Sequence, residues 1–520
     1  MAGHSGHLQF WLLVVCLGLT STVSGHTADR LPGWQGERHR HHTAGHAVRD
    51  DTTTRHSNRR VDENSVQEHA TNHALRIKAA PPPTKWTEIE NPSYIPGCGI
   101  HALRTSPRHS HMNFTQQPVE TEWLYQYEAN NMAYTHMAMM TILPNGTVLV
   151  IWQASERNEG DKLQHFELSS SMEPLTQVPA GSMGDVQFNY PEPLRVGGRG
   201  GEGEAVWGPT FFLSEVCGTM CGTLWLFYSQ SKGACLGAPP TMHWAPGGDI
   251  KAITMDLATG QWSTPRTLYA QEEDGNIPKV TANKMIELKT GEWLLPFWKE
   301  NALLRKTGPA CRAMRGHQGA GVLRSTDKGS TWVPHGNLVR HDTWLIENAL
   351  VQLHNGTVLM IFRTRIGEIY RVLSHDTGIT WSDSAPLGDP ALPNPNAKVD
   401  VIALDPTGAL ALVYNDHTKP PDVPGMPECI KCRTKLSVAL SMDSGNTWSK
   451  VAVIEDEIGA SLRFHYPTIQ QYGCNLFVAY SKFYSKKLGI TDPAFDEQGI
   501  KLARISLDHI FPLNFDKDDV

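Results

Sequence analysis

The sequence predicts an all-β protein, a six-bladed β-propeller whose blades carry a repeated turn motif. The motif S-x-D-x-G-x-T-W occurs at Ser325–Trp332, Ser374–Trp381 and Ser441–Trp448. The copies begin 49 residues (374 − 325) and 67 residues (441 − 374) apart, which is the scale of a four-stranded blade rather than of a helical repeat. Alternating apolar runs broken by turn residues fill the chain from about residue 134, and no long amphipathic helix interrupts them.

The repeated motif, called the Asp box below, is predicted to form a tight turn. Its Asp accepts backbone N–H bonds, its Gly takes a left-handed conformation, and its Trp packs the turn against the sheet. Met255–Trp262 keeps the Asp, Gly and Trp and is interpreted as a degenerate copy. Asp boxes are expected on the outer rim and ligands near the axis, so the motif predicts architecture rather than an active site.

Six groups of paired strands account for six blades within residues 134–510. In chain order they are His136–Ser155, Trp207–Leu213 with Gly222–Gln230, Asn283–Glu300, Glu347–Arg365, Val399–Asp416, and Tyr466–Phe483 with Gly499–Leu507. The first, second and third Asp boxes follow the third, fourth and fifth groups. Residues 79–133 are an N-terminal extension that either wraps the propeller or closes its last blade, and residues 511–520 form a tail.

The N-terminus predicts a secreted protein. The apolar run Phe10–Thr20, followed by the small residues of Ser21–Gly25, is typical of a cleavable signal peptide at residues 1–25 and is too short to span a bilayer comfortably. No later segment has the length of a membrane span. Residues 26–78 are rich in His and Arg without periodic apolar residues, which predicts a disordered or propeptide-like segment, with a metal-binding His tract as the alternative.

Cysteines and sequons fit the same compartment. An even number of cysteines follows the signal, which predicts disulfide bonds between members of the set Cys98, Cys217, Cys221, Cys235, Cys311, Cys429, Cys432 and Cys474. Their close pairs lack zinc-finger spacing, so no metal is expected. Three N-x-T sequons predict glycosylation at Asn113, Asn145 and Asn355, the last two in apparent hairpin turns. The formal charge of −7 does not favour nucleic acid or an anionic membrane as a partner.

Two segments and the Asp boxes together resemble the sialidase superfamily over roughly residues 134–507. Glu347–Arg363 has a glutamate opening one strand and an arginine closing the next, and RFHYPTI, which contains Tyr466, is similar to the family's segment with a nucleophilic tyrosine. The resemblance implies a glycoside hydrolase that removes a terminal acidic sugar from a glycoconjugate without a cofactor. It implies that Tyr466 is the nucleophile, Glu347 its base, and Arg363 and Arg433 the arginines that bind the sugar carboxylate.

The chemistry of these residue types agrees with those roles. A tyrosine is a poor nucleophile at neutral pH unless a nearby carboxylate takes its proton. A neutral phenol also avoids the repulsion that a carboxylate nucleophile would meet at the anomeric centre of an anionic sugar. Planar guanidinium groups bind a carboxylate bidentately. The structural alternative is that Glu347, Tyr466 and Arg363 are strand-end polar groups that hydrogen-bond between blades.

Blade one departs from the family pattern. Where sialidases carry their first carboxylate-binding arginine in an R-I-P type motif, this chain has His136, which is either a ligand-binding residue or a satisfied core histidine. The following loop, Ala154–Lys162, is where the resemblance implies the general acid, and Asp161 is the best match, with Glu156 and Glu159 close behind. Such an acid needs a pKa raised by its neighbours.

Further polar residues complete the candidate pocket. A third cation is available from Arg365, Arg371 or Arg463, each of which is equally explained as an inter-blade or surface charge. Amides at Asn394, Asn396 and Asn415 are expected at the axial face, where they suit sugar hydroxyls, although Asn-Pro also makes ordinary turns.

Two other functions fit the same sequence. One is a polysaccharide-processing enzyme acting on a uronide, by hydrolysis or by β-elimination with Tyr466 and His136 as acid and base; histidine in place of arginine favours it. The other is a non-catalytic propeller that binds glycans or extracellular matrix, for which Asp boxes, disulfides and glycans are equally natural.

Overall fold

A computed structural model describes residues 117–507 with internal gaps, the longest at 197–204, 237–242, 301–316, 418–432 and 485–496. The chain divides into two units, residues 1–67 and 68–520, and every described residue belongs to the second. The predicted signal peptide, the His/Arg-rich segment, the Asn113 sequon, Cys429 and Cys432, and the tail lie outside the described residues.

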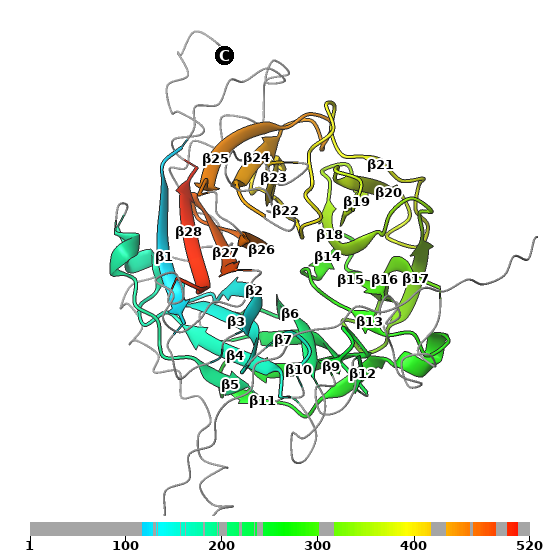
Figure 1. The fold of residues 1–520 in the computed structure, drawn as a ribbon, viewed down its shortest axis with the longest axis horizontal. Helices are drawn as coiled ribbons and strands as arrows, with labels where there is room; N and C mark the ends of the chain where they lie inside the picture. Colours follow the sequence, from blue (N-terminus) through cyan, green and yellow to red (C-terminus); the bar gives the residue numbers. More distant parts are fainter. Residues whose placement is uncertain are drawn as a thin grey trace, which may run out of the picture. The chain divides into compact units, whose positions relative to one another are not determined.

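The second unit is a six-bladed propeller, as predicted, with its six sheets arranged around a central axis (Figure 1). The first three blades are built in chain order. Their strands are β2 (Tyr134–Ile142), β3 (Val148–Ser155), β4 (His165–Ser170) and β5 (Glu192–Leu194) in blade one; β6 (Val206–Ser214), β7 (Thr223–Gln230), β10 (Asp249–Asp256), β11 (Gln261–Trp262) and β12 (Arg266–Tyr269) in blade two; and β13 (Lys279–Val280), β14 (Ile286–Glu287), β15 (Trp293–Lys299), β16 (Gly319–Ser325) and β17 (Val333–Leu338) in blade three.

Blades four and five repeat the four-stranded plan, and blade six is completed by the N-terminal strand. Their strands are β18 (Ile346–Gln352), β19 (Val358–Arg363), β20 (Tyr370–Ser374) and β21 (Ala385–Pro386); β22 (Asp400–Ala403), β23 (Leu410–Asn415), β24 (Leu436–Ser441) and β25 (Ser449–Glu455); and β26 (Leu462–Tyr472), β27 (Asn475–Tyr484), β28 (Gly499–Ser506) and β1 (Val119–Gln126).

The ring closes because β1 pairs antiparallel with β28 as the outermost strand of blade six. Of the two arrangements expected for the N-terminal extension, closure of the last blade is therefore the one observed for Val119–Gln126.

A few short elements lie outside the blades. They are the hairpin β8 (Ala234–Leu236) and β9 (His243–Trp244) and the 3-10 helices η3 (Leu175–Gln177), η4 (Met183–Asp185) and η5 (Gln271–Asp274). Among the described residues, no helix is long and apolar enough to cross a membrane. A disulfide joins Cys217 to Cys221, and Cys474 is also disulfide-bonded.

The three Asp boxes form the turn that their sequence predicts, each between the third and fourth strand of its blade. In the first box, Asp327 accepts hydrogen bonds from the Ser325 hydroxyl at 2.8 Å and from the Thr331 backbone N–H at 2.8 Å. Gly329 has φ of 82°, and the Trp332 indole N–H donates to its carbonyl at 3.0 Å. The Thr331 hydroxyl, which donates to Asp327 Oδ2 at 2.6 Å, lowers the pKa of Asp327 to about 2 together with these donors. The degenerate box also turns, because Asp256 accepts the N–H groups of residues 258 and 259.

The apolar core lies between neighbouring blades rather than along the axis. Blades five and six share one buried cluster, which includes Leu404, Val438, Phe464 and Ile505. Corresponding clusters join the other neighbouring pairs. The alternating strands bury apolar side chains toward adjacent blades, which leaves the axial ends of the innermost strands for polar residues.

Four innermost strands carry a β-bulge at an equivalent place. The pairing skips residues between His136 and Met139, Trp207 and Thr210, Ile346 and Ala349, and His465 and Thr468. In each case the first skipped residue is left-handed, with φ of 54° at Met137, 55° at Gly208, 50° at Glu347 and 54° at Tyr466. A bulge redirects a side chain, and a left-handed non-glycine residue costs about 1–3 kcal/mol, so such positions are often functional.

The glycine at the blade-two bulge is required by a close backbone approach. A Cβ on Gly208 would lie 1.6 Å from the Thr281 carbonyl oxygen of blade three. We expect Gly208→Ala to lower the free energy of unfolding by about 2–4 kcal/mol, because the clash adds to the left-handed strain. Gly356, with φ of 89° and open space around its Cα, is the control, and Gly356→Ala should cost only about 1 kcal/mol. Equal losses in urea denaturation would contradict the prediction.

Candidate active site

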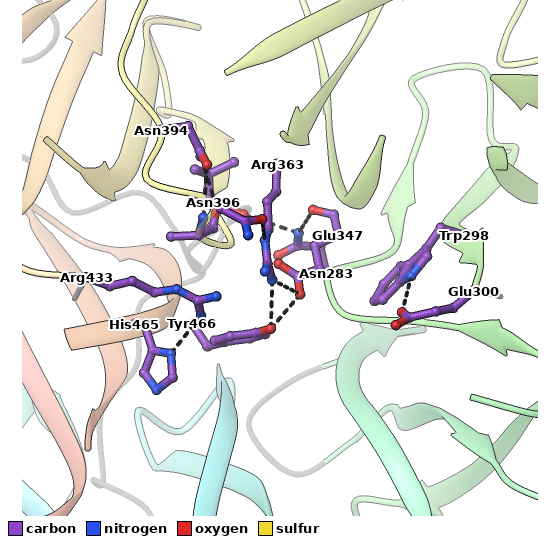
Figure 2. A network of polar contacts seen from close by, with 12 residues as sticks. Asn283, Trp298, Glu300, Glu347, Arg363, Asn394, Asn396, Arg433, His465 and Tyr466 are labelled. Carbon is purple, nitrogen blue, oxygen red and sulfur yellow. Dashed lines mark hydrogen bonds and ion pairs between the residues drawn. The ribbon is translucent and has the colours of Figure 1, made fainter. Parts of the chain in front are cut away.

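Three predicted residues from two blades meet at the axis (Figure 2). The Tyr466 hydroxyl donates a hydrogen bond to Glu347 Oε1 at 2.6 Å. Arg363 Nη1 donates to the same oxygen at 2.6 Å and to the Tyr466 hydroxyl oxygen at 3.0 Å. Tyr466 and Glu347 occupy the left-handed bulge positions of β26 and β18, while Arg363 ends β19 beside Glu347. The two bulges thus direct a phenol and a carboxylate from different blades toward one point.

The charges of this cluster suit a tyrosine that gives its proton to a carboxylate. Burial raises the pKa of Glu347, but the charge and hydrogen bond of Arg363 outweigh burial and hold that pKa below its ordinary value. Burial, and next the charge of Glu347, raise the pKa of Tyr466. At neutral pH the pair is therefore a neutral phenol donating to a carboxylate. Among the described residues Glu347 Oε2 is buried without a hydrogen-bond partner, which leaves it available to a bound molecule.

Arg433 and two histidines line the other side of Tyr466. The Arg433 guanidinium lies 5.6 Å from the centre of the Tyr466 ring, and its Nη1 lies 3.0 Å from His465 Nδ1. The His136 ring packs edge-on against Tyr466 with a centroid distance of 4.0 Å. Burial, and next neighbouring charges that include Arg433, lower the pKa values of His136 and His465 well below the ordinary value. His136 therefore reaches the site as a neutral imidazole and does not replace an arginine's charge.

The three arginines considered for a third cation differ in position. Arg371 donates to Gly445 and Asn446 of the neighbouring Asp box, so it is an inter-blade contact of the rim. Arg365 stacks on Trp344, with its guanidinium 3.1 Å from the ring centre. Arg463 interacts electrostatically with Tyr466, Glu159 and Arg363, and its backbone bridges to Arg433. Arg463 is thus the candidate that the structure brings to the Tyr466 side of the site.

Among the acids of the loop after β3, Glu159 is coupled to the site. Glu159 is exposed, but its carboxyl accepts a hydrogen bond from Tyr134, and the surrounding protein raises its pKa by desolvation, with the charge of Glu347 as the next cause. Glu156 is exposed. Asp161, the best sequence match, is bonded through its backbone to Asn158 and Gln164 of its own loop. Of the acids in this loop, the structure therefore favours Glu159 over Asp161 as the one coupled electrostatically to the cluster.

Of the three predicted asparagines, one contacts a site residue and two hydrogen-bond to backbone groups. Asn396 Oδ1 accepts a hydrogen bond from Arg363 Nε at 2.7 Å and so orients the guanidinium. Asn394 closes a turn on Ala397 with both ends of its amide. Asn415 is fully buried and donates to the carbonyls of Thr434 and Phe464, joining blades five and six. The contacts of Asn394 and Asn415 that the structure shows are structural, and the sugar-binding role expected of these residues stays a prediction.

The sequons in the described part are placed as predicted. Asn145 lies in the β2–β3 hairpin turn and Asn355 in the β18–β19 turn, where each side chain caps its own turn. Asn355 is exposed and Asn145 half-buried. No cluster of metal-ligating side chains is found among the described residues.

Sequence reasoning missed Glu300, a carboxyl on the blade-three side of the site. Glu300 follows β15, and its Oε2 accepts a hydrogen bond from the Trp298 indole N–H at 2.9 Å (Figure 2). Burial, opposed by that hydrogen bond and assisted by Glu347, raises its pKa to about 7. No local signal marks the residue, because its burial depends on the folded structure and the charged groups that perturb it come from blades one and four.

Glu300 makes stability depend on pH. Its folded-state pKa of about 7 exceeds the ordinary value of 4.5, so the folded protein binds the proton more tightly than the unfolded chain does. This contribution is complete below about pH 4.5 and is lost as pH rises through 7, by at most about 3 kcal/mol for a pKa difference of 2.5 (7 − 4.5). We expect Glu300→Gln to flatten the fall in unfolding free energy between pH 5 and 8, as measured by urea titration. An unchanged slope in the variant would contradict the assignment.

The fold is that of a sialidase-like propeller, and comparisons with solved structures agree. A protein of unknown function from Dyadobacter fermentans has TM-score 0.52 and 14% identity, covering 75% of this chain and 99% of that chain. A Trypanosoma rangeli sialidase in complex with sialic acid has TM-score 0.51 and 13% identity, covering 77% of this chain and 61% of that one. An intramolecular trans-sialidase from Ruminococcus gnavus has TM-score 0.51 and 11% identity, covering 74% and 97%. At such identities the likeness concerns the fold.

The sequence itself gives the family. Residues 193–478, more than half of the chain, match the family described as BNR repeat-like domain. The chain therefore belongs to this family, and its fold is that of the sialidases. No curated protein matches the sequence.

Proposed function

We propose that the protein is a secreted sialidase-like glycoside hydrolase that removes a terminal acidic sugar from glycoconjugates. The observation that carries the proposal is the 2.6 Å hydrogen bond from Tyr466 to Glu347, with Arg363 contacting both. A buried phenol, a carboxylate with a lowered pKa and two arginines at one axial point supply a nucleophile, a base and an anion-binding wall.

The proposed reaction has two steps. First, Glu347 takes the Tyr466 proton, the phenol oxygen bonds to the anomeric carbon, and the glycosidic oxygen leaves with a proton from the acid of the loop after β3. Second, water attacks the anomeric carbon, the loop carboxylate takes its proton, and the tyrosine leaves and regains its proton from Glu347. Two displacements retain the anomeric configuration.

Glu159 is the proposed proton donor. Its raised pKa keeps more of it protonated near neutrality, as a general acid requires, and its electrostatic partners include Glu347, Arg433 and Arg363. Arg433, whose pKa burial lowers to about 10, is still charged at neutral pH and joins Arg363 in binding the sugar carboxylate.

The experiment is hydrolysis of fluorogenic glycosides by the purified protein. The panel pairs α-sialosides and β-uronides with neutral glycosides of matched ring size and with their carboxyl methyl esters. Turnover of an acidic sugar, loss of turnover on esterification, and retention by proton NMR would support the proposal. A folded protein that turns over only neutral sugars, or none of the panel, would refute it.

The His136 contact favours a second candidate, a lyase acting on uronides. The neutral His136 imidazole, with its ring centre 4.0 Å from that of Tyr466, and the Tyr466 phenol would serve as the base and acid pair for β-elimination. This reaction consumes no water and makes a uronide whose new carbon–carbon double bond is conjugated to its carboxylate and absorbs in the ultraviolet. Appearance of that chromophore from a uronide polymer would select the lyase over the hydrolase.

A further inference from the structure

A buried polar layer lies directly behind the tyrosine bulge and is contributed by blade five. Lys398, at 1% exposure, donates through Nζ to the Pro467 carbonyl oxygen at 2.6 Å. Asp400 Oδ2 accepts the Ile469 backbone N–H at 2.9 Å and the Thr468 hydroxyl at 3.2 Å. Two side chains of one blade therefore contact the three residues that follow Tyr466 in the next blade.

The bulge creates the need for these contacts. Pairing of β26 with β27 stops at His465 and resumes at Thr468, so Tyr466 and Pro467 have no partner in that ladder. Proline has no N–H, and a buried carbonyl without a donor is costly. The Lys398 ammonium supplies the donor that the neighbouring strand does not. It thereby stabilises a backbone that is already strained by the left-handed Tyr466.

The charge behind the bulge is balanced locally. Asp400 pairs with Lys284 of blade three, and Lys398 lies within the field of both. Burial lowers the pKa of Lys398 to about 8, with opposing contributions from Asp400 and Glu347 and a further lowering by Lys284. An ammonium is thus kept in the interior at neutral pH. Burying such a charge costs free energy unless the ammonium is hydrogen-bonded and paired, as the Lys398 ammonium is by the Pro467 carbonyl and the nearby Asp400.

We propose that Lys398 is a positioning residue for Tyr466, holding the bulge through the Pro467 carbonyl so that the phenol stays within hydrogen-bond distance of Glu347. The expected loss of kcat rests on the proposed function, whereas the expected displacement of Tyr466 does not. Without the ammonium the bulge relaxes toward regular pairing of β26 with β27. The Tyr466 side chain then changes direction, because a shift of one residue in the pairing moves a side chain to the opposite face of the sheet.

The chain offers a matched control in blade three. Lys279 is fully buried, its pKa is likewise lowered by burial to about 8, and its Nζ donates to the carbonyls of Ala270 at 2.9 Å and Gln271 at 2.7 Å. Both lysines lose a buried ammonium on replacement by methionine, but only Lys398 contacts the segment after Tyr466. Any effect on Tyr466 that is confined to Lys398 variants is therefore a positioning effect.

The test measures Tyr466 directly. In the full-length protein with ¹³C-labelled tyrosine, the Tyr466 ring resonance is identified by its loss in Tyr466→Phe. We expect Lys398→Met to shift this resonance and Lys279→Met to leave it in place, although both lower the melting temperature. On an acidic glycoside, Lys398→Met should lower kcat at least about 10-fold with KM little changed, because misplacement of a reacting group by 1 Å costs up to about 100-fold. Lys279→Met should keep the parental kcat.

The outcomes separate the two proposals. A Tyr466 resonance unmoved in folded Lys398→Met, or moved equally by Lys279→Met, overturns the positioning role. A parent that hydrolyses no glycoside refutes the proposed function, while the resonance still decides the role of Lys398. If Lys398→Met does not fold, Lys398→Gln serves instead, since its shorter amide does not reach Pro467 and the same shift is expected.

Discussion

Replacing Tyr466 with phenylalanine is expected to lower kcat by at least about 10³-fold on the acidic glycoside that the parent hydrolyses. The substitution removes one oxygen, which is the proposed nucleophile, and keeps the ring that packs against His136. Arg363 continues to donate to Glu347 Oε1 at 2.6 Å, so the carboxylate is not left alone in the interior. The loss should therefore appear in activity far more than in stability.

Tyr480→Phe is the matched control for this measurement. Tyr480 is also fully buried, lies on β27 of the same blade, and donates to Glu455 at 2.6 Å, as Tyr466 does to Glu347. Both variants lose a tyrosine–glutamate hydrogen bond, worth about 1.5–3 kcal/mol to a charged acceptor. Only Tyr466→Phe should lose turnover. A Tyr466→Phe protein that keeps more than a tenth of the parental kcat would exclude a tyrosyl intermediate.

Much of the fold was predictable because its signals are local. Each Asp box closes through contacts within eight residues, so Ser325–Trp332 predicts its turn without knowledge of the rest of the chain. The hairpins around Asn145 and Asn355 are likewise determined by the Asn-Gly pair between two apolar runs. Closure of blade six by Val119–Gln126 depends on β28, almost 400 residues away, and the sequence left it as one of two alternatives.

The site residues that lie in a recognisable motif were predictable from the sequence, and the others were not. Glu347, Arg363 and Tyr466 follow from the resemblance, and the structure brings them together. The left-handed backbone that directs Glu347 and Tyr466 was not foreseen, because neither residue type favours positive φ and the cause lies in contacts from other blades. Glu300, Lys398 and the choice of Glu159 over Asp161 depend in the same way on groups that converge only in three dimensions.

Arg363→Met is expected to have the second large effect, which appears both in the free energy of unfolding and in kcat/KM. Arg363 supplies the charge that keeps Glu347 ionised in the interior, so its removal leaves a buried carboxylate uncompensated and should lower the free energy of unfolding by about 3–5 kcal/mol. Without that charge, burial raises the pKa of Glu347, and a protonated Glu347 does not accept the Tyr466 proton. We therefore also expect kcat/KM on the acidic glycoside to fall at least about 10³-fold.

A double-mutant cycle with Glu347→Gln distinguishes this coupling from general damage. If the cost of Arg363→Met is an unpaired buried charge, then adding Glu347→Gln, which removes that charge, should recover about 1–3 kcal/mol of the lost unfolding free energy without restoring activity. Arg504→Met is the control, because Arg504 is a buried arginine that pairs at 2.8 Å with the partly exposed Glu120 on the outer side of blade six. Its loss should cost stability and spare turnover. Strictly additive free energies for Arg363 and Glu347 would show that the two side chains do not act as a pair, and the assignment of Glu347 as an arginine-stabilised base would fail with them.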